Sequence, residues 1–210
     1  SGDMLTYDEA HTFNVADFKV HIPAYSVYDD YHFNIDIRNK TENTLSKEYH
    51  LMDKNIPLHK EIVVNITDTI PEILKDKSYI AIKKEDGKFI YKGKTWKNGS
   101  LYAKTREFGI FTVVADTINP TIYDFNLKNK TRINFPGKIS VKISDKESGI
   151  SYYRGEIDGN WILMEYDFKS DLLIYHIDKE KLQKGEHNLK IIVRDRLDNE
   201  SVLTKKFIFN

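Results

Sequence analysis

Apolar side chains recur at every second position through much of this chain. Phe18, Val20 and Ile22 are separated by single polar residues, for example. The same period appears in segments 33–37, 62–66, 111–113, 139–143 and 189–193. Side chains two positions apart line one face of a strand, as in an antiparallel sheet with one face buried. No segment sustains the 3.6-residue period of a helix, so the chain is predicted to be all-β.

The segment Asp116-Thr-Ile-Asn-Pro120 is predicted to divide the chain into two domains. The preceding strand ends there, and Pro120 lacks the N–H that a central strand needs. The part that follows favours an immunoglobulin-like or fibronectin-like β-sandwich at residues 118–210. The strand-rich residues 1–117 are predicted to form another β-sandwich. The short strands predicted in the second part are 121–127, 138–144, 150–157, 161–166, 172–177, 188–195 and 202–209.

Tight-turn residues punctuate these strands. Asp158-Gly159 lies between segments 152–157 and 161–166, and this arrangement predicts a β-hairpin because Gly accepts the positive φ of such turns. Gly149, Gly155 and Gly159 are all expected in turns, since they do not form a phosphate-binding loop.

Charge and composition exclude several classes of protein. Lys and Arg total 32, and Asp and Glu total 32, so the chain lacks the basic excess that is typical of nucleic-acid binders. No apolar run approaches the roughly 18 residues of a membrane span. The chain has no cysteine, which excludes disulfides, thiol nucleophiles and Cys-ligated zinc.

Catalytic motifs are mostly missing from the sequence. No pair of the seven histidines has His-x-His or His-x-x-x-His spacing, and there is no Gly-x-Ser-x-Gly motif. His32 and Asp36 stand four apart, which in one strand would put both on the same face. They are either two ligands of a metal site or the exposed polar face of a half-buried strand. We expect no enzyme activity from this chain, with a hydrolase whose ligands meet only in the fold as an alternative.

Two acidic strand ends are candidates for a calcium site. Asp145 and Glu147 follow one predicted strand, and Asp195, Asp198 and Asn199 follow another. Loops at one end of a sandwich can bring such oxygen ligands together, and calcium takes six to eight of them. Alternatively, these side chains bond to nearby backbone groups and shape the turns.

Aromatic residues are candidates for a sugar-binding surface. Trp96, Trp161 and Tyr153, with the neighbouring Tyr152 and Tyr166, carry rings on which a sugar could stack. The alternative is that these rings fill the core or its margin, because each buries a large apolar area.

An ordered set of segments resembles the C-terminal, non-catalytic region of lysostaphin-like cell-wall metallopeptidases (peptidase family M-23) of the Bacteroidetes type. The resemblance covers nearly the whole chain. The segments are Phe18-Lys-Val-His-Ile-Pro-Ala24, Thr105-Arg-Glu-Phe-Gly-Ile-Phe111 leading to Asp116-Thr-x-x-Pro120, Ile143-Ser-Asp-x-x-Ser-Gly-Ile150, Ile157-Asp-Gly-x-Trp-Ile-Leu-x-Glu-Tyr-Asp167, and Lys184-Gly-x-His-x-Leu189 leading to Val193-x-Asp-x-x-Asp-Asn199. The first half is also similar to ZU5-type sandwich modules, through its Ile-Pro-Ala start and its Phe-Gly-x-Phe end.

The resemblance implies no catalytic residue in this chain. The peptidase domains of that family bind zinc through a His-x-Gly-x-Asp segment and a later His-x-His, and they hydrolyse peptide cross-bridges in peptidoglycan. Here Asn34 stands where the family has Gly, and the His-x-His is missing. The resemblance therefore implies that a zinc peptidase domain lies upstream in the same polypeptide.

These observations give an expected function and one rival. The chain is expected to be a non-catalytic accessory region in the cell envelope, periplasmic or extracellular, without a cofactor of its own. It would position or regulate the upstream zinc domain, or bind peptidoglycan or another envelope protein. The alternative is a stand-alone glycan-binding or adhesive protein of the cell surface.

Overall fold

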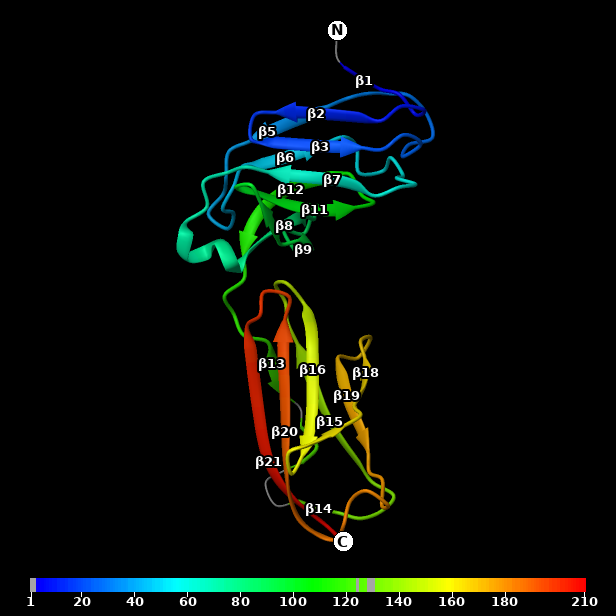
Figure 1. Ribbon diagram of the computed structural model, residues 1–210, viewed down its shortest axis with the longest axis vertical. Coiled ribbons are helices and arrows are strands. Elements are labelled where there is room, and N and C mark those ends of the chain that lie inside the picture. The colour runs from blue at the N-terminus through cyan, green and yellow to red at the C-terminus, as the bar shows by residue number, and fades with distance from the viewer. Residues whose placement is uncertain (1–2, 124, 128–130) are drawn as a thin grey trace. The chain divides into compact units, whose positions relative to one another are not determined.

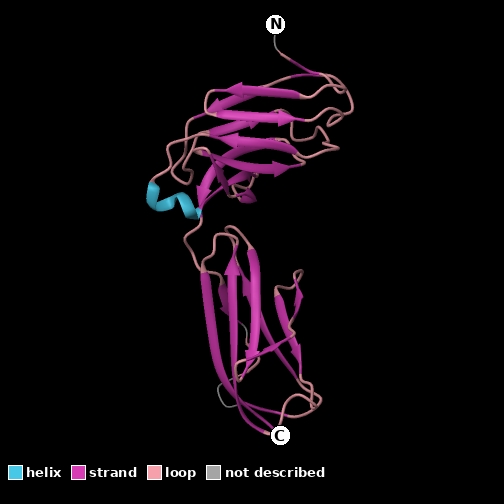
Figure 2. Ribbon diagram, in the orientation of Figure 1, coloured by secondary structure: helices cyan, strands magenta, loops and turns pink. Residues whose placement is uncertain are grey.

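The computed structural model describes residues 3–123, 125–127 and 131–210, and nearly all of their regular structure is β-strand (Figure 2). The chain divides into two compact units, Ser1–Asp116 and Thr117–Asn210. In each unit the strands form sheets around a separate apolar core. The predicted all-β architecture of two consecutive β-sandwiches is confirmed.

The first unit contains two five-stranded antiparallel sheets and a two-stranded ribbon. Along β3, buried Phe18, Val20 and Ile22 alternate with exposed Lys19 and His21, so the two-residue period does place one face in the core. One sheet has the order β10 (Thr95–Lys97), β11 (Ser100–Thr105), β7 (Ile62–Ile66), β3 (Phe18–Ile22), β2 (His11–Val15). The other has the order β5 (Ile35–Arg38), β6 (Glu48–Leu51), β12 (Gly109–Ala115), β8 (Ser78–Lys83), β9 (Phe89–Gly93), and the ribbon pairs β1 (Met4–Leu5) with β4 (Tyr31–His32).

A short 3₁₀ helix, η1 (Glu72–Lys77), follows β7 in the first unit (Figures 1 and 2). The sequence pattern did not predict it, because six residues are too few to show a helical period. Within the described residues, no helix has the length and apolar character that crossing a bilayer requires.

The second unit pairs a four-stranded with a five-stranded sheet (Figure 1). Its longest hairpin joins β20 to β21, and buried residues alternate with exposed ones along β20. The smaller sheet has the order β13 (Thr121–Tyr123), β15 (Lys138–Ser144), β19 (Leu172–His176), β18 (Glu165–Asp167). The larger has the order β14 (Thr131–Ile133), β21 (Glu200–Phe209), β20 (Gly185–Asp195), β16 (Ile150–Ile157), β17 (Asn160–Ile162), with only the β14–β21 pair parallel. Residue 124, inside the predicted strand 121–127, lies outside the described residues.

The prediction of one strand over residues 161–166 is wrong, because the chain changes sheets within that range. β17 is the edge strand of the larger sheet and β18 is the edge strand of the smaller one. Between them Met164 is buried in the core while Leu163 is exposed. The strand is therefore broken at the point where the chain crosses the open side of the sandwich.

Gly155 is likewise not in a turn, as the sequence suggested, but in the middle of β16. It pairs with Ile162 of β17, and a Cβ atom there would lie 2.5 Å from the sulfur of Met164. The absence of a Cβ atom thus lets the Met164 side chain pack closely on β16. Gly149 and Gly159 do occupy turns with positive φ, at 87° and 81°.

Candidate functional site

A groove of about 760 Å³ lies on the side of the second unit where the two sheets end. It begins at β17 and the crossing segment, and it extends to β19 and the turn that follows β19. Its volume falls within the usual range for small-molecule sites, roughly 300–1,000 Å³. The lining residues are Ile157, Asp158, Asn160, Trp161, Ile162, Leu163, Glu165, Ile174, Tyr175, His176, Asp178, Lys181, Leu182, Gln183 and His187.

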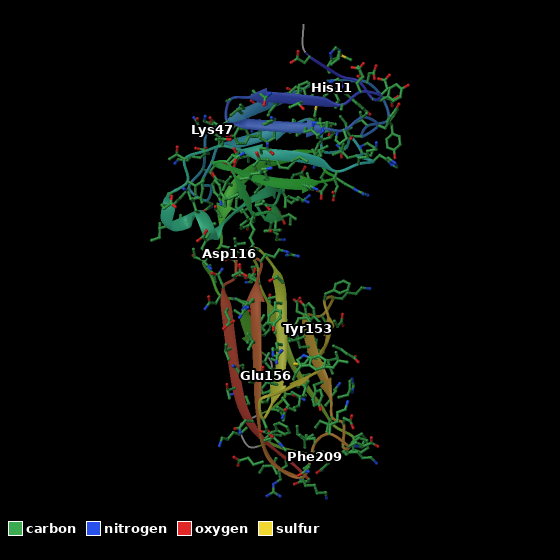
Figure 3. All side chains as sticks on the ribbon, viewed as in Figure 1. His11, Lys47, Asp116, Tyr153, Glu156 and Phe209 are labelled. Atoms are coloured by element: carbon green, nitrogen blue, oxygen red, sulfur yellow. The ribbon has the colours of Figure 1, made fainter. Side chains whose placement is uncertain are left out.

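Trp161 is an exposed aromatic residue that lines the groove. It pairs with Glu156 of β16, which is labelled in Figure 3, and 59% of the Trp161 residue surface stays exposed. The adjacent Leu163 is 65% exposed. Large apolar side chains are costly to leave in water, and neighbouring exposed ones mark binding surfaces more often than isolated ones.

A hydrogen-bonded triad of polar groups lies beside these apolar residues. The Nδ1 atom of His187 is 2.6 Å from Oδ2 of Asp158, and its Nε2 atom is 2.7 Å from the carbonyl oxygen of Gln183. The other carboxylate oxygen of Asp158 accepts a hydrogen bond from the backbone N–H of Asn188. These bonds tie the 158–159 hairpin to the start of β20, and β20 in turn to Gln183 just before it, so this part of the groove has a fixed shape.

The same contacts explain the ionisation of Asp158. Burial by itself raises the pKa of this carboxyl. The backbone N–H of Asn188 and the ring of His187 oppose that effect and hold the pKa below its ordinary value. Asp178 also has a lowered pKa, chiefly because its carboxylate accepts the backbone N–H of Glu180. The groove therefore presents ionised carboxylates at neutral pH.

The other two predicted aromatic ligands pack against cores. Trp96 in the first unit is partly buried against the core, and its Nε1–H donates to the carbonyl oxygen of Lys75 at 3.0 Å. Tyr153, labelled in Figure 3, packs against the core of the second unit with its ring 5.5 Å from that of Tyr166. Of the three, only Trp161 lies in the groove.

Two of the five predicted calcium ligands come together. Carboxylate oxygens of Asp145 and Asp195 lie within 4.8 Å of each other. Asp195 is fully buried and accepts hydrogen bonds from the N–H groups of Leu197 and Asn199 and from the Asn199 side-chain amide. These contacts match the turn-shaping alternative, in which the amide nitrogen of Asn199 faces the carboxylate.

Within the described part of the chain, Asp198 and Glu147 do not belong to the acidic group that contains Asp145 and Asp195. Asp198 is exposed with a φ of 61°, and Glu147 is half-buried in the loop after β15. Nearby, the guanidinium of Arg196 donates to the carbonyl oxygen of Ser148, so a fixed cation already lies at this end of the unit.

His32 and Asp36 do not share a strand, contrary to the prediction. His32 belongs to β4 in the ribbon and Asp36 to β5 in a five-stranded sheet. Residues 33 and 34 between them are not in a strand, so the four-residue spacing no longer places both on one face. Asp36 instead pairs with the exposed Arg38 at 2.9 Å.

Sequence reasoning missed His187, Gln183 and Leu163 as groove residues. His187 and Asp158 are 29 positions apart and meet only because β16 pairs with β20. The one local signal was the Gly-x-His pattern at 185–187, where Gly185 has a φ of 141° at the start of β20.

Comparisons with solved structures give remote likenesses. An endo-β-1,4-mannanase from Thermotoga petrophila aligns with 11% identity and a TM-score of 0.39, over 45% of this chain and 20% of the mannanase chain. Fibronectin(III)-like modules of CbhA from Clostridium thermocellum align with 15% identity and a TM-score of 0.36, over 85% and 94% of the two chains. A chimeric titin Z1Z2 tandem aligns with 10% identity and a TM-score of 0.31, over 85% and 99%.

No curated protein matches the chain. In contrast, the sequence model of the Zu5-like domain matches residues 2–116, which are more than half of the 210 residues. This match confirms the similarity to ZU5-type modules that Ile22-Pro23-Ala24 and Phe108-Gly109-Ile110-Phe111 indicate. The chain therefore belongs to the Zu5-like domain family.

Proposed function

We propose that this chain is a non-catalytic accessory protein that binds a polysaccharide in the groove of its second sandwich. The observation that carries this proposal is the exposed Trp161 ring at the groove, next to a set of polar side chains. A pyranose has an apolar face of C–H groups and a rim of hydroxyls. An indole ring complements the first, and carboxylate, amide and imidazole groups complement the second.

The lining residues supply both kinds of contact. Trp161 and Leu163 form the apolar part, while Asn160, Asp178 and Gln183 offer hydrogen-bonding groups. Acceptors and donors thus lie within one site, as a chain of hydroxyl groups requires. The fixed bonds of His187 keep the groove in shape before a ligand arrives, which lowers the entropy cost of binding.

A binding panel tests this proposal. Purified chain is incubated with insoluble polysaccharides, including peptidoglycan sacculi and β-1,4-mannan, and the bound fraction is measured. We expect at least one polysaccharide to retain the chain and Trp161→Ala to release it, with Trp161→Phe partly retained. Phe168→Ala is the matched control, because Phe168 is an exposed ring (73%) of the same unit that does not line the groove. If Phe168→Ala reduces retention as much as Trp161→Ala does, the result would contradict the proposal.

The resemblance to M-23 peptidases supports a more specific setting. In this setting the chain lies in the cell envelope, the polysaccharide is peptidoglycan, and a zinc peptidase domain lies upstream in the same polypeptide. The chain would then hold that domain on its substrate. Sequencing the coding frame upstream of Asp3 tests this setting: a His-x-Gly-x-Asp segment with a later His-x-His supports it, and a frame without them contradicts it.

A further inference from the structure

A second exposed surface lies among the loops of the first unit, and it consists of three tyrosine rings. Tyr7 is 46% exposed, Tyr25 is 57% exposed and Tyr28 is 63% exposed. The rings of Tyr7 and Tyr25 lie 6.3 Å apart in an edge-to-face arrangement. We call Tyr7, Tyr25 and Tyr28 the tyrosine surface. In Figure 3, rings and oxygen-tipped side chains gather at the loops beside the labelled His11.

The loops that carry these rings are bonded to one another. The backbone N–H of Tyr25 donates to the carbonyl oxygen of Tyr7 at 2.7 Å, and that of Tyr7 donates to Oδ1 of Asp30 at 2.9 Å. A third loop joins them, since the N–H of His59 donates to the carbonyl oxygen of Ser26. The rings are therefore presented by a cross-linked set of loops.

Tyr25 is also held in a costly backbone conformation. Its φ is 61°, in the left-handed region that a bulky side chain seldom adopts. Such strain persists only where the surrounding contacts impose it. In this conformation more than half of the Tyr25 surface is exposed.

The tyrosine surface already holds one cation of its own chain. The ammonium of Lys60 lies 5.3 Å from the centroid of the Tyr25 ring and donates to the carbonyl oxygen of Ala24. Four exposed carboxylates adjoin Tyr7 or Tyr28 in the sequence, and among the described residues no ion pair joins Asp8, Glu9 or Asp29 to a cation. The fourth is Asp30. One ammonium against four carboxylates leaves this surface negative.

We propose that the tyrosine surface binds a lysine-rich or arginine-rich segment of a partner polypeptide. Ring faces attract ammonium and guanidinium groups, as Lys60 shows on Tyr25, and carboxylates pair with the same groups. A neutral glycan would use the rings but leave the carboxylates without a role. This surface belongs to the first unit and its function is independent of the groove around Trp161.

Fluorescence anisotropy with labelled peptides tests the proposal. The full chain is titrated into three peptides of equal length, which are lysine/arginine-rich, glutamate-rich and serine/glycine-rich. We expect the basic peptide alone to bind, and its affinity to fall as the salt concentration rises, because salt screens exposed charges. Equal binding of all three peptides, or binding of none, would overturn the proposal.

Two substitutions locate the site. Tyr28→Ala removes an exposed ring, and Tyr25→Gly removes a ring while relieving the positive φ, so both variants should fold. We expect each substitution to lower the affinity for the basic peptide about threefold to thirtyfold. The matched control Tyr123→Ala removes a tyrosine of similar exposure (42%) from the second unit and should leave affinity unchanged.

Charge and site controls complete the design. Asp29→Asn should lower the affinity for the basic peptide. Asp76 is an exposed carboxylate on η1 of the same unit, and Asp76→Asn should leave that affinity unchanged. Trp161→Ala should leave peptide binding intact, so that failure of the groove proposal and failure of this one are separable. Equal effects of the tyrosine-surface variants and their controls would overturn the proposal, whatever the peptide preference.

Discussion

Asp158 and His187 lie 29 residues apart and form a hydrogen bond of 2.6 Å in the groove that Trp161 lines. The second ring nitrogen of His187 faces the carbonyl oxygen of Gln183, which can only accept. Both nitrogens therefore donate when the ring is protonated. The pair closes the 158–159 hairpin onto the start of β20, and this fixes one side of the groove.

Asp158→Asn should lower the free energy of unfolding at neutral pH by about 1 kcal/mol, since it removes a charge-assisted hydrogen bond of a partly exposed carboxylate. Asn tolerates the φ of 51° at this turn position, so the substitution leaves the turn intact. Urea unfolding of the wild type and the variant gives the difference. An unchanged midpoint at pH 7 would mean that the pair does not stabilise the fold.

The same comparison has a pH dependence with a definite sign. The folded-state pKa of Asp158 lies below its ordinary value. Asp158 therefore makes its full contribution to the free energy of unfolding above the unfolded-state pKa, which is about 3.9. That contribution is lost as the pH falls through the folded-state pKa. The difference between wild type and Asp158→Asn should therefore shrink in a urea series from pH 7 to about pH 3. A difference that grows toward acid pH would contradict this assignment.

Gly155→Ala should destabilise the second unit by about 1–3 kcal/mol, because the new methyl group would overlap Met164 and Ile162. Met164→Ala makes room for it, so the double variant should lose less than the sum of the two single losses. A double-mutant cycle by urea unfolding measures this coupling. Strict additivity would show that Gly155 and Met164 do not interact.

The two tryptophans should differ in their importance for stability. Trp96→Phe removes a hydrogen bond to the Lys75 carbonyl and leaves a gap at the core, which should cost about 1–2 kcal/mol. Trp161→Phe changes an exposed ring and should stay within about 0.5 kcal/mol of the wild type. Thermal unfolding of both variants tests this contrast. Equal losses would mean that Trp161 is a structural ring.

Asp195→Ala should be the most damaging of these substitutions, at about 2–4 kcal/mol. It leaves the buried N–H groups of Leu197 and Asn199 without their acceptor. Asp195→Asn keeps one acceptor oxygen and should cost less. Near-wild-type stability of Asp195→Ala in urea would contradict a turn-shaping role.

The strands were predictable from sequence because burial follows the two-residue period. In β3 the apolar positions are the buried ones, and in β20 buried Leu189, Ile191 and Val193 keep the same period. The break at residues 163–164 was not predictable, because residues 161–164 are all apolar and no change of period marks it. Only the pairing of β17 and β18 in different sheets shows that the chain crosses over. A local sequence pattern indicates which side chains are buried, but not which sheet their strand joins.

The candidate site was only partly predictable for a related reason. Trp96 and Trp161 have the same chemistry, and their different exposure depends on the strands that surround each one. The hydrogen bond of Asp158 with His187 depends on the register of β16 against β20. The spacing of His32 and Asp36 misled because a strand boundary falls between them.

The central claim, that Trp161 is the ring on which a polysaccharide stacks, is tested most directly by NMR of the two indole N–H groups. The chain has two tryptophans. The indole N–H of Trp96 donates to the Lys75 carbonyl oxygen, and its signal serves as an internal control. Oligosaccharides released from the polysaccharide that retains the chain are titrated in. We predict that the Trp161 signal shifts in a saturable manner while the Trp96 signal stays in place. A Trp161 signal that does not move with bound oligosaccharide would contradict the account.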